Sequence, residues 1–206
     1  MENVTQHADP HYDPEASKLG MWLFIFTELL LFGGLFLVYS IYRYINPEAF
    51  RLGGEELNPV IGAINTIILL VSSMTIAMST SALQKKNKAL TVLLIEITIL
   101  FAVIFLVNKY FEWGVKFEHG IWPGSSHLIN DMSNGEVLFF GLYFIMTGLH
   151  ALHIVAGMII IIVALKGVQS GKVNENRPSL LENAGLYWHL VDLIWIFLFP
   201  LFYLIH

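Results

Sequence analysis

Six ionisable side chains stand inside long apolar stretches of this sequence: Glu28, Glu96, His150, His153, His189 and Asp192. An ionisable group near the centre of a bilayer costs ~2.5–3.5 kcal/mol or more, so it usually faces protein or water and has a partner. A carboxyl group in such a place can hold a proton, and an imidazole can exchange a proton with it or ligate a metal. These residue types therefore indicate proton holding, polar contacts between helices, or metal binding.

The spacing of these residues favours one pairing. His150 and His153 are three residues apart and share one face of a helix. At 1.5 Å per residue, Glu28 lies ~14 Å from the start of its apolar stretch and Glu96 ~10 Å, and the depth of Glu28 is similar to that of His153. We therefore expect Glu28 to pair with His153, and we interpret Glu28 and Glu96 as buried, proton-related carboxylates.

Each of these groups also has a purely structural interpretation. A neutral Glu can donate one hydrogen bond to a neighbouring helix, and a buried His is more often a packing residue than a ligand. Asp192, which the apolar pattern places near a helix start, can match the positive end of the helix dipole. Two His on one face are a weak metal signal without a third ligand, so we predict no metal site.

Composition sets the class of protein in which these groups lie. Of the 206 residues, 56% are hydrophobic and 13% are charged, which is about half the charge of a typical soluble protein. This argues against a soluble domain and a disordered chain, and the net charge of −5 argues against a nucleic-acid binder. There is no cysteine, so disulfides and thiolate sites are excluded. The class that remains is a polytopic membrane protein.

Five apolar stretches are long enough to cross a membrane as helices. They are continuously apolar and do not alternate, which favours helices over a transmembrane barrel. We predict an all-α bundle in a single domain, residues 19–206, after an N-terminal cytoplasmic tail, residues 1–18. The expected helices are residues 19–42, 59–83, 89–108, 136–165 and 184–205. The longest predicted loop is therefore 109–135, and the first helix is too long for a signal peptide.

Lys and Arg predict the orientation of this bundle. Seven lie on the side of the N-terminus and four on the other side, which places the N-terminus in the cytoplasm and the C-terminus outside. The seven are Lys18, Lys85, Lys86, Lys88, Lys166, Lys172 and Arg177, and the four are Arg43, Arg51, Lys109 and Lys116. No internal repeat is visible, which disfavours an independent transporter.

Beyond these patterns, the chain resembles subunit III of the haem–copper respiratory oxidases, in its five-helix bacterial form. Residues 147–153 are similar to the family's T-G-x-H-x-L-H, and residues 188–195 to its W-H-x-x-D-x-x-W. Residues 20–29 look like its first helix, with Glu28 at the family carboxylate, and residues 57–73 resemble its second. Tyr110-Phe111-Glu112 matches an aromatic-aromatic-Glu element. Several long matches in the family order make the resemblance specific.

The resemblance implies a non-redox subunit of a proton-pumping terminal oxidase, in which cytochrome c donates electrons and O₂ is reduced to water in aerobic respiration. It implies no catalytic residue and no cofactor in this chain: haem and copper are expected in subunits I and II. The implied partners are those subunits, other respiratory-complex subunits and structural phospholipid, in the bacterial cytoplasmic (inner) membrane. Subunit III would stabilise subunit I, hold lipid and support proton uptake.

The resemblance also implies roles for single residues. Glu28 corresponds to a carboxylate that reacts with carbodiimide, which needs a protonated carboxyl group in apolar surroundings. Six residues are expected to organise the bundle and its lipid cleft: His150, His153, His189, Asp192, Glu112 and Trp188. Glu96 matches no family motif, and its expected role rests on burial alone.

Three other functions remain open from the sequence. The electron donor can be a quinol, because the donor site would lie on another subunit. A homologue associated with nitric-oxide reductase is a close alternative. A membrane electron carrier that binds haem through His150, His153 and His189 is more distant, because two His on one helix face point the same way.

Overall fold

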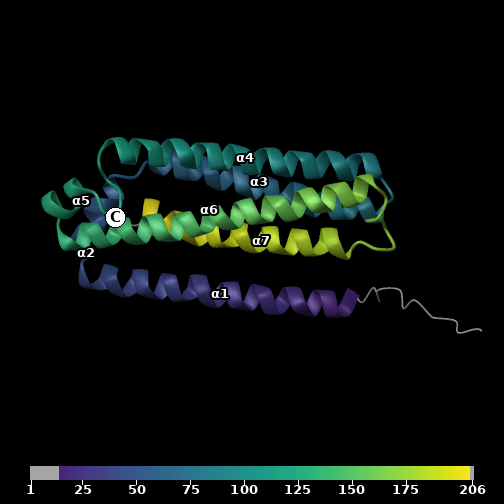
Figure 1. Cartoon of the computed structure of the whole chain (residues 1–206), viewed down its shortest axis with the longest axis horizontal. Helices are drawn as coiled ribbons and strands as arrows, with labels where there is room; N and C mark the ends of the chain where they lie inside the picture. Colours follow the sequence, from purple (N-terminus) through teal and green to yellow (C-terminus); the bar gives the residue numbers. More distant parts are fainter. Residues whose placement is uncertain (1–13, 205–206) are drawn as a thin grey trace, which may run out of the picture.

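A computed structural model describes residues 14–204, and all of its regular elements are helices (Figure 1). Five of them are long and apolar enough to cross a membrane: α1 (Pro14–Ile45), α3 (Pro59–Gln84), α4 (Lys88–Glu118), α6 (Asn134–Gln169) and α7 (Ser179–Phe199). Two short helices, α2 (Pro47–Glu55) and α5 (Ser126–Asp131), lie between them, and a π-helix, η1 (Pro200–Leu204), continues α7. The predicted all-α bundle with five spans is confirmed.

Local chemistry explains where the long helices begin. The side chain of Asn58 accepts a hydrogen bond from the Val60 amide at 2.9 Å, and Pro59 supplies the first helical position of α3. Asn87 caps α4 in the same way. At the start of α6, Ser133 and Glu136 bond to each other's backbone amides in a capping box. Side chains next to the apolar stretches thus satisfy the amides that each helix start leaves free.

Several predicted boundaries are wrong because the helices are longer than their apolar stretches. α4 ends at Glu118 and not at 108, so the first part of the predicted 109–135 loop is helical. α7 begins at Ser179, five residues before its predicted start. α1 begins at Pro14, so part of the predicted tail is helical, and the rest of that tail, residues 1–13, lies outside the described residues.

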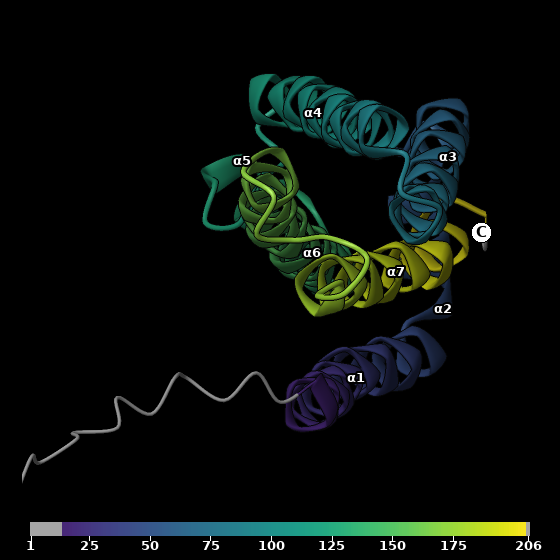
Figure 2. The same cartoon turned by 90° about the vertical axis from the view of Figure 1, so that its right-hand side faces the viewer.

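α1 stands apart from the other long helices. Figure 2 shows α3, α4, α6 and α7 arranged around a common centre, with α1 beside them and nearest to α7. Only 11% of the most apolar window of α1 is buried, against 56% for α7. An apolar groove of about 190 Å³ lies between the two helices. It is lined by Leu29, Phe32, Gly33 and Phe36 of α1 and by Leu193, Ile194 and Phe197 of α7.

The four-helix part has a dense core in which α6 and α7 approach closely. A Cβ atom at Gly157 of α6 would lie 2.9 Å from ring atoms of both Trp188 and Tyr187 of α7. Only glycine fits this contact without a shift, and small residues at such places let membrane helices pack closely. Trp188 is buried there, and its Nε1 donates a hydrogen bond to Ser72 Oγ of α3 at 3.0 Å. This one side chain therefore joins three helices.

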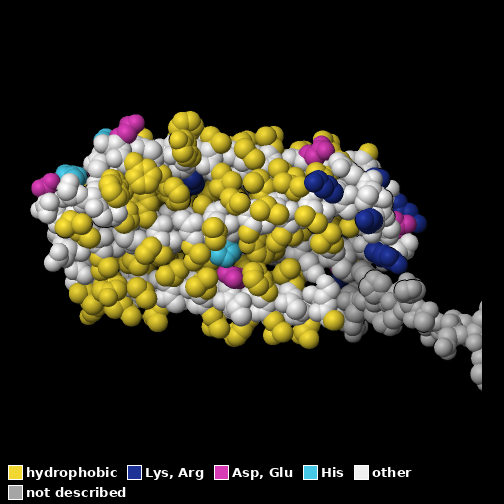
Figure 3. Space-filling model, in the orientation of Figure 1, with side chains coloured by type: hydrophobic (Ala, Val, Ile, Leu, Met, Phe, Trp, Pro, Cys, Tyr) yellow, Lys and Arg dark blue, Asp and Glu magenta, His cyan; other side chains and the backbone are white. Residues whose placement is uncertain are grey.

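The two ends of the bundle differ in charge. Figure 3 shows hydrophobic side chains over the middle of one face and Lys and Arg gathered at the end where α1 begins. We call this the basic end: it holds the start of α1, the α3–α4 turn and the α6–α7 loop, and its basic residues include Lys85, Lys86, Lys88, Lys166 and Lys172. The other end, with α2 and α5, is called the opposite end. Which end faces the cytoplasm stays a prediction.

Candidate functional site

Glu28 of α1 and His153 of α6 meet across the space between α1 and the other helices. His153 Nε2 lies 3.0 Å from Glu28 Oε2, and the two side chains are 11% and 13% exposed. The distance is that of an ion pair, but Oε2 makes no hydrogen bond of good angle. This contact links the loosely packed α1 to the bundle through one carboxyl group and one imidazole.

The second ring nitrogen of His153 defines where the protons are. Its Nδ1 lies 2.7 Å from the backbone oxygen of Leu149, one turn earlier on α6. A carbonyl oxygen only accepts, so Nδ1 carries a hydrogen. Two arrangements are then possible at Nε2. Either Nε2 also carries a proton, so that a cationic ring faces a carboxylate, or an unprotonated Nε2 faces a protonated Glu28. Two unprotonated acceptors would repel each other at 3.0 Å. In both arrangements the Glu28–His153 pair is neutral overall.

Aromatic rings surround the Glu28–His153 pair. Phe32, one turn after Glu28 on α1, packs edge-on against the His153 ring at 5.4 Å between centroids. Tyr187 of α7 donates a hydrogen bond to the His153 carbonyl at 3.3 Å. Phe32 also lines the apolar groove between α1 and α7. The Glu28–His153 pair therefore lies beside a groove that opens to the outside of the bundle.

His150 lies one turn from His153 but does not join it. It is fully buried, and neither of its ring nitrogens has a hydrogen-bond partner among the described residues. Its ring stacks on Trp195 at 5.2 Å and meets Phe105 edge-on at 5.6 Å. His150 and His153 therefore contact different surroundings and share no ligand-sized space.

His189 and Asp192 of α7 meet Ser73 of α3. His189 Nδ1 is 2.5 Å from Ser73 Oγ, and Asp192 lies near the same hydroxyl, while its buried Oδ1 has no hydrogen-bond partner among the described residues. Asp192 is buried, whereas His189 is exposed and lines a cavity between α1, α3 and α7. Because α7 begins at Ser179, Asp192 lies in the middle of the helix. The interpretation that Asp192 matches the positive end of the helix dipole is therefore wrong. These residues form a polar contact between α3 and α7.

Glu96 lies on the outside of the bundle. Its side chain is exposed on α4, and it makes no hydrogen bond or ion pair with the residues that the structure describes. The expectation of a buried carboxylate is therefore wrong. Helical periodicity explains the error: the neighbouring Ile95 and Thr98 are buried, and Glu96 falls on the other side of the same helix.

A second polar cluster, of which only Glu112 is expected from the sequence, lies in the half of the bundle towards the opposite end. Lys109 of α4 is 2% exposed, and its Nζ lies 3.2 Å from Glu112 Oε2 and from Tyr143 Oη, and 3.0 Å from Tyr203 Oη. Glu112 Oε1 accepts hydrogen bonds from Tyr143, at 2.5 Å, and from Tyr203. We call these four residues the Lys109 cluster. All its charged atoms have partners.

Three elements build the Lys109 cluster. The spacing of three on α4 places Lys109 and Glu112 on one face, α6 supplies Tyr143, and η1 supplies Tyr203. Aromatic rings of Trp113, Tyr143, Trp195 and Tyr203 lie within 5.1–5.8 Å of Lys109 Nζ, in the range of cation–π attraction. The widened turn of η1 sits where Tyr203 enters the cluster, which fits the frequent use of π-turns at such sites.

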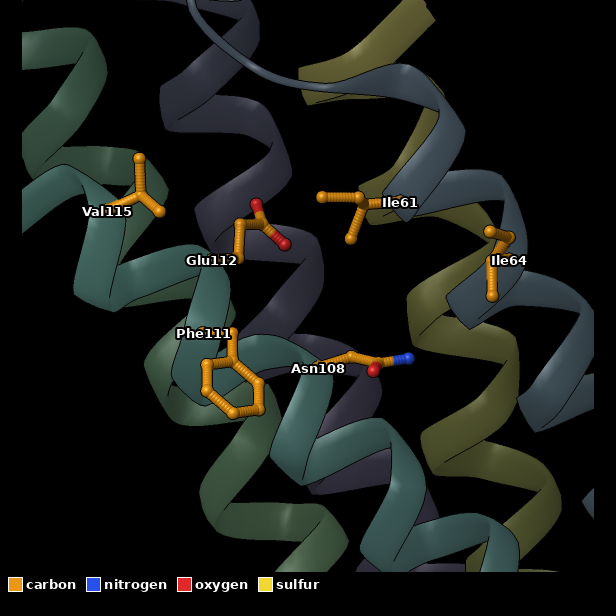
Figure 4. Close-up of a pocket in the computed structure, with 6 residues that line it drawn as sticks. All are labelled: Ile61, Ile64, Asn108, Phe111, Glu112 and Val115. Carbon is orange, nitrogen blue, oxygen red and sulfur yellow. The ribbon is translucent and has the colours of Figure 1, made fainter.

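A pocket of about 270 Å³ lies next to this cluster, between α3 and α4. The carboxyl group of Glu112 points from α4 towards Ile61 of α3, and Asn108 lies one turn away (Figure 4). Asn108 donates a hydrogen bond to Asn65 of α3 at 2.9 Å. The pocket is thus apolar on its walls and polar where it reaches the cluster.

The sequence contains a pattern that indicates the Lys109 cluster, but its charged residues lead to the prediction of a loop. Lys109, Glu112 and Lys116 were predicted in a loop outside the membrane, and all three are buried on α4. Lys116 Nζ donates to the backbone oxygen of Glu56, in the α2–α3 connection. The Lys–x–x–Glu spacing and the aromatic residues around it could have indicated a continued helix. Tyr143 and Tyr203 had no signal, because their contacts join distant parts of the chain.

Within residues 14–204, no three His, Asp or Glu side chains converge as metal ligands would. The comparison with known proteins then identifies the chain. The family described as cytochrome c oxidase subunit III matches residues 7–206. The chain belongs to this family. It is therefore a multi-pass membrane subunit of a haem–copper oxidase complex, an oxidoreductase.

Three curated relatives show the range of the family. A cytochrome c oxidase subunit 3 of Synechocystis sp. is 32% identical, over 95% of this chain and 78% of the relative. A haem–copper oxidase subunit I+III of Aeropyrum pernix is 31% identical over 91% of this chain, which spans 22% of that longer protein. A probable quinol oxidase subunit 3 of Staphylococcus saprophyticus is 28% identical, over 94% of this chain and 91% of the relative.

Proposed function

We propose that this chain is the non-redox subunit III of a proton-pumping terminal oxidase that reduces O₂ to water in aerobic respiration, with cytochrome c as electron donor. The observation that carries the proposal is the Glu28–His153 pair, which can hold one proton beside a groove that opens to the outside of the bundle. A subunit with such a pair can supply protons to a neighbouring catalytic subunit without carrying electrons.

The proposed partners are oxidase subunits I and II, which would carry the haem and copper, within a bacterial inner membrane. The relative from Aeropyrum pernix supports a close association, because it is named as a joined subunit I+III. With the N-terminus in the cytoplasm, the basic end would face the cytoplasmic side, in agreement with the bias of Lys and Arg. The Glu28–His153 pair would then lie on a path for proton uptake.

Structural phospholipid is a further proposed partner. The groove between α1 and α7 is apolar and suits an acyl chain. At the basic end, a cavity of about 420 Å³ between α1, α3 and α7 is lined by both apolar and charged groups. Among them are Lys18 and Glu182, whose charged atoms are 3.2 Å apart. A zwitterionic headgroup can exchange partners with this ion pair while its acyl chain lies in the groove.

Co-purification in mild detergent tests the assembly. Tagged wild-type chain is expected to bring down partner subunits with the absorption bands of haem and the metal content of a copper enzyme. A lone stable oligomer without haem would contradict the proposal. A haem band that stays at equal stoichiometry with the isolated chain would instead support the electron-carrier alternative.

Replacement of the Glu28 carboxyl group by an amide tests the proposed role of Glu28 in proton uptake. Glu28→Gln keeps the shape and the contact with His153 but cannot take up a proton, so assembly is expected to stay intact while proton uptake during turnover slows. Glu118→Gln, at the exposed end of α4, is the matched control and should behave like wild type. Loss of assembly in Glu28→Gln, or unchanged proton uptake, would contradict the role proposed for Glu28.

The quinol oxidase is the second candidate, favoured by the similarity to the Staphylococcus saprophyticus relative. The purified complex can be given reduced cytochrome c or a reduced quinol in separate assays of O₂ consumption. Turnover with cytochrome c alone supports the first proposal, and turnover with quinol alone supports the second. Both outcomes leave the role of the Glu28–His153 pair the same.

A further inference from the structure

Glu96 is the feature of this chain that neither proposed site uses. It lies eight residues after the first residue of α4, so at 1.5 Å per residue it is ~12 Å along the helix. Its carboxyl group is exposed and has no partner among the described residues. An ionisable group at such a depth rarely faces lipid, because the hydrocarbon gives it neither charge nor hydrogen bonds. Something else must cover it in the membrane.

Among the described residues, no other exposed Asp, Glu, Lys or Arg of a membrane-spanning helix lies so far from a helix end. In the described membrane-spanning helices, the other exposed ones are Lys18, Lys88, Glu118 and Lys166, all within four residues of an end of their helix. These groups can reach water or headgroups, as long side chains near helix ends commonly do. The exposed face of α4 therefore differs from those of α3 and α6. The exposed imidazole of α7, His189, differs from Glu96 because it has a partner, Ser73.

Glu96 lies in a continuous stripe on that face, the α4 seam: Leu93, Glu96, Leu100, Val103, Val107 and Tyr110. The intervals between these positions alternate between three and four residues. Side chains at such intervals pack against a second helix that crosses at a small, left-handed angle. All six side chains are exposed in this chain. The next position in the same rhythm is Gly114, where an added Cβ would meet nothing within 4 Å. A small residue on an open face lets another helix come close.

We propose that the α4 seam is an interface for a transmembrane helix of another oxidase subunit, and that this helix presents a cationic or hydrogen-bond-donating side chain to Glu96. Charge complementarity selects this occupant. A second copy of the chain in a two-fold dimer would place Glu96 opposite Glu96, and two carboxylates at close range repel each other. A lipid tail would leave Glu96 without a partner. The inference rests on the proposed function for the identity of the partner complex.

Substitutions at Glu96 show whether another subunit or lipid covers this face of α4, because the two cases predict different rankings of how well each variant is retained in the complex. If a donor covers Glu96, retention of the chain in the detergent-purified complex falls from wild type through Glu96→Gln to Glu96→Leu, because Gln still accepts a hydrogen bond and Leu does not. We expect Glu96→Leu to lower the association constant about tenfold, equivalent to ~1.4 kcal/mol. If Glu96 faces lipid, Glu96→Leu is retained as well as wild type or better, and the inference is overturned.

Photo-crosslinking identifies what lies on the seam. A benzophenone amino acid in place of Leu100, which is 57% exposed on the α4 seam, is compared with the same substitution at Ile159, which is 56% exposed on α6. The expected result is a crosslink from position 100 to another oxidase subunit that Glu96→Leu weakens, while any crosslink from position 159 is unchanged by Glu96→Leu. A crosslinked dimer of this chain, an adduct with lipid alone, or a position-100 crosslink that Glu96→Leu does not weaken overturns the inference.

One further outcome separates the inference from the proposed function. If wild-type chain co-purifies with haem-containing subunits but position 100 crosslinks to none of them, the proposed function stands and the α4 seam is not the interface. If wild-type chain co-purifies with no such subunit, both proposals fail together.

Discussion

Glu112 is a buried carboxylate and Glu28 a half-buried one, and each lies beside a basic side chain. The two carboxylates differ in how many hydrogen-bond partners they have. Glu112 accepts from Tyr143 and Tyr203 and pairs with Lys109, whose ammonium group has three polar partners. Glu28 has one close partner, His153, and its Oε2 makes no hydrogen bond of good angle. A fully satisfied network of hydrogen bonds holds its geometry firmly, whereas a pair with few partners is less constrained. The comparison favours a structural role for the Lys109 cluster, and the chemical role of Glu28 stays a proposal.

The two sites also differ in what they connect. The Lys109 cluster joins α4, α6 and η1 inside the well-packed part of the bundle. The Glu28–His153 pair joins α6 to α1, which stands apart from the other helices and shares a groove with α7. Loss of a contact in the first site should therefore affect the stability of the whole fold. Loss of the second should affect only how α1 docks and how protons move there.

Lys109→Met is expected to have the largest effect on stability. It leaves the buried carboxylate of Glu112 without its counter-ion, and such a change typically costs ~3–5 kcal/mol. Thermal unfolding of the detergent-purified complex measures this loss. The double variant Lys109→Met/Glu112→Gln is expected to recover much of it, because Gln still accepts from the tyrosines and no charge stays buried. A single variant as stable as wild type would remove the contrast between the two sites.

Tyr203→Phe is expected to have the next largest effect. It removes the hydroxyl that donates to Glu112 and accepts from Lys109, and a hydrogen bond to a charged group contributes ~1.5–3 kcal/mol. The thermal midpoint should fall by less than in Lys109→Met, since Tyr143 still bonds to both charges. The matched variant is Tyr187→Phe, which removes one hydrogen bond to the His153 carbonyl and should cost less. The reverse order would mean that the Lys109 cluster is not the tighter site.

The contrast between the two sites shows what the sequence could and could not predict. Apolar length predicted the five crossings because the cost of unpaired backbone in lipid fixes the helix length. The same criterion ended α4 too early, because it counts Lys109 and Glu112 as charges and takes no account of their pairing inside the protein. The prediction that Glu96 is buried is wrong for the opposite reason. The sequence shows that Glu96 lies in an apolar stretch, but not that its side of α4 has no neighbouring helix.

Residue pairs were predictable only where depth limits the choices. Glu28 and His153 could be matched because few ionisable groups share their depth, although the role of the pair stays a prediction. The contact between Glu112 and Tyr203 spans 91 positions in the chain and depends on the π-turn at the end of α7. No local pattern encodes such a contact, since tyrosines near helix ends in membranes are common in any case.

Carbodiimide labelling sharpens the comparison without changing stability much. The reagent attacks protonated carboxyl groups from the lipid phase, so Glu28, beside an open groove and able to take its proton back from His153, is expected to be labelled. Glu112 is held by three partners and should stay unlabelled. Peptide mass spectrometry reads both sites in one sample, and Glu28→Gln should abolish the label while costing ~1 kcal/mol or less, about one modest hydrogen bond. Equal labelling of the two carboxyl groups would contradict the assignment of Glu112 to a closed network.

The smallest effect on thermal stability is expected at the exposed ion pairs of Arg51 on α2, which serve as a reference for the two sites inside the bundle. Arg51 lies between Glu48, at 2.7 Å, and Glu55. The hydrogen bond from Arg51, and then its charge, hold the pKa of Glu48 below its ordinary value. A carboxyl pKa that is lower in the folded state adds stability above its ordinary pKa, and this contribution is lost as the pH falls through the folded value. Exposed pairs contribute little, because water and salt screen them. Arg51→Gln should therefore lower the thermal midpoint only slightly at neutral pH, and the difference should vanish in acid. If Arg51→Gln destabilises the protein as much as Tyr203→Phe, then burial does not set the strength of these charge pairs.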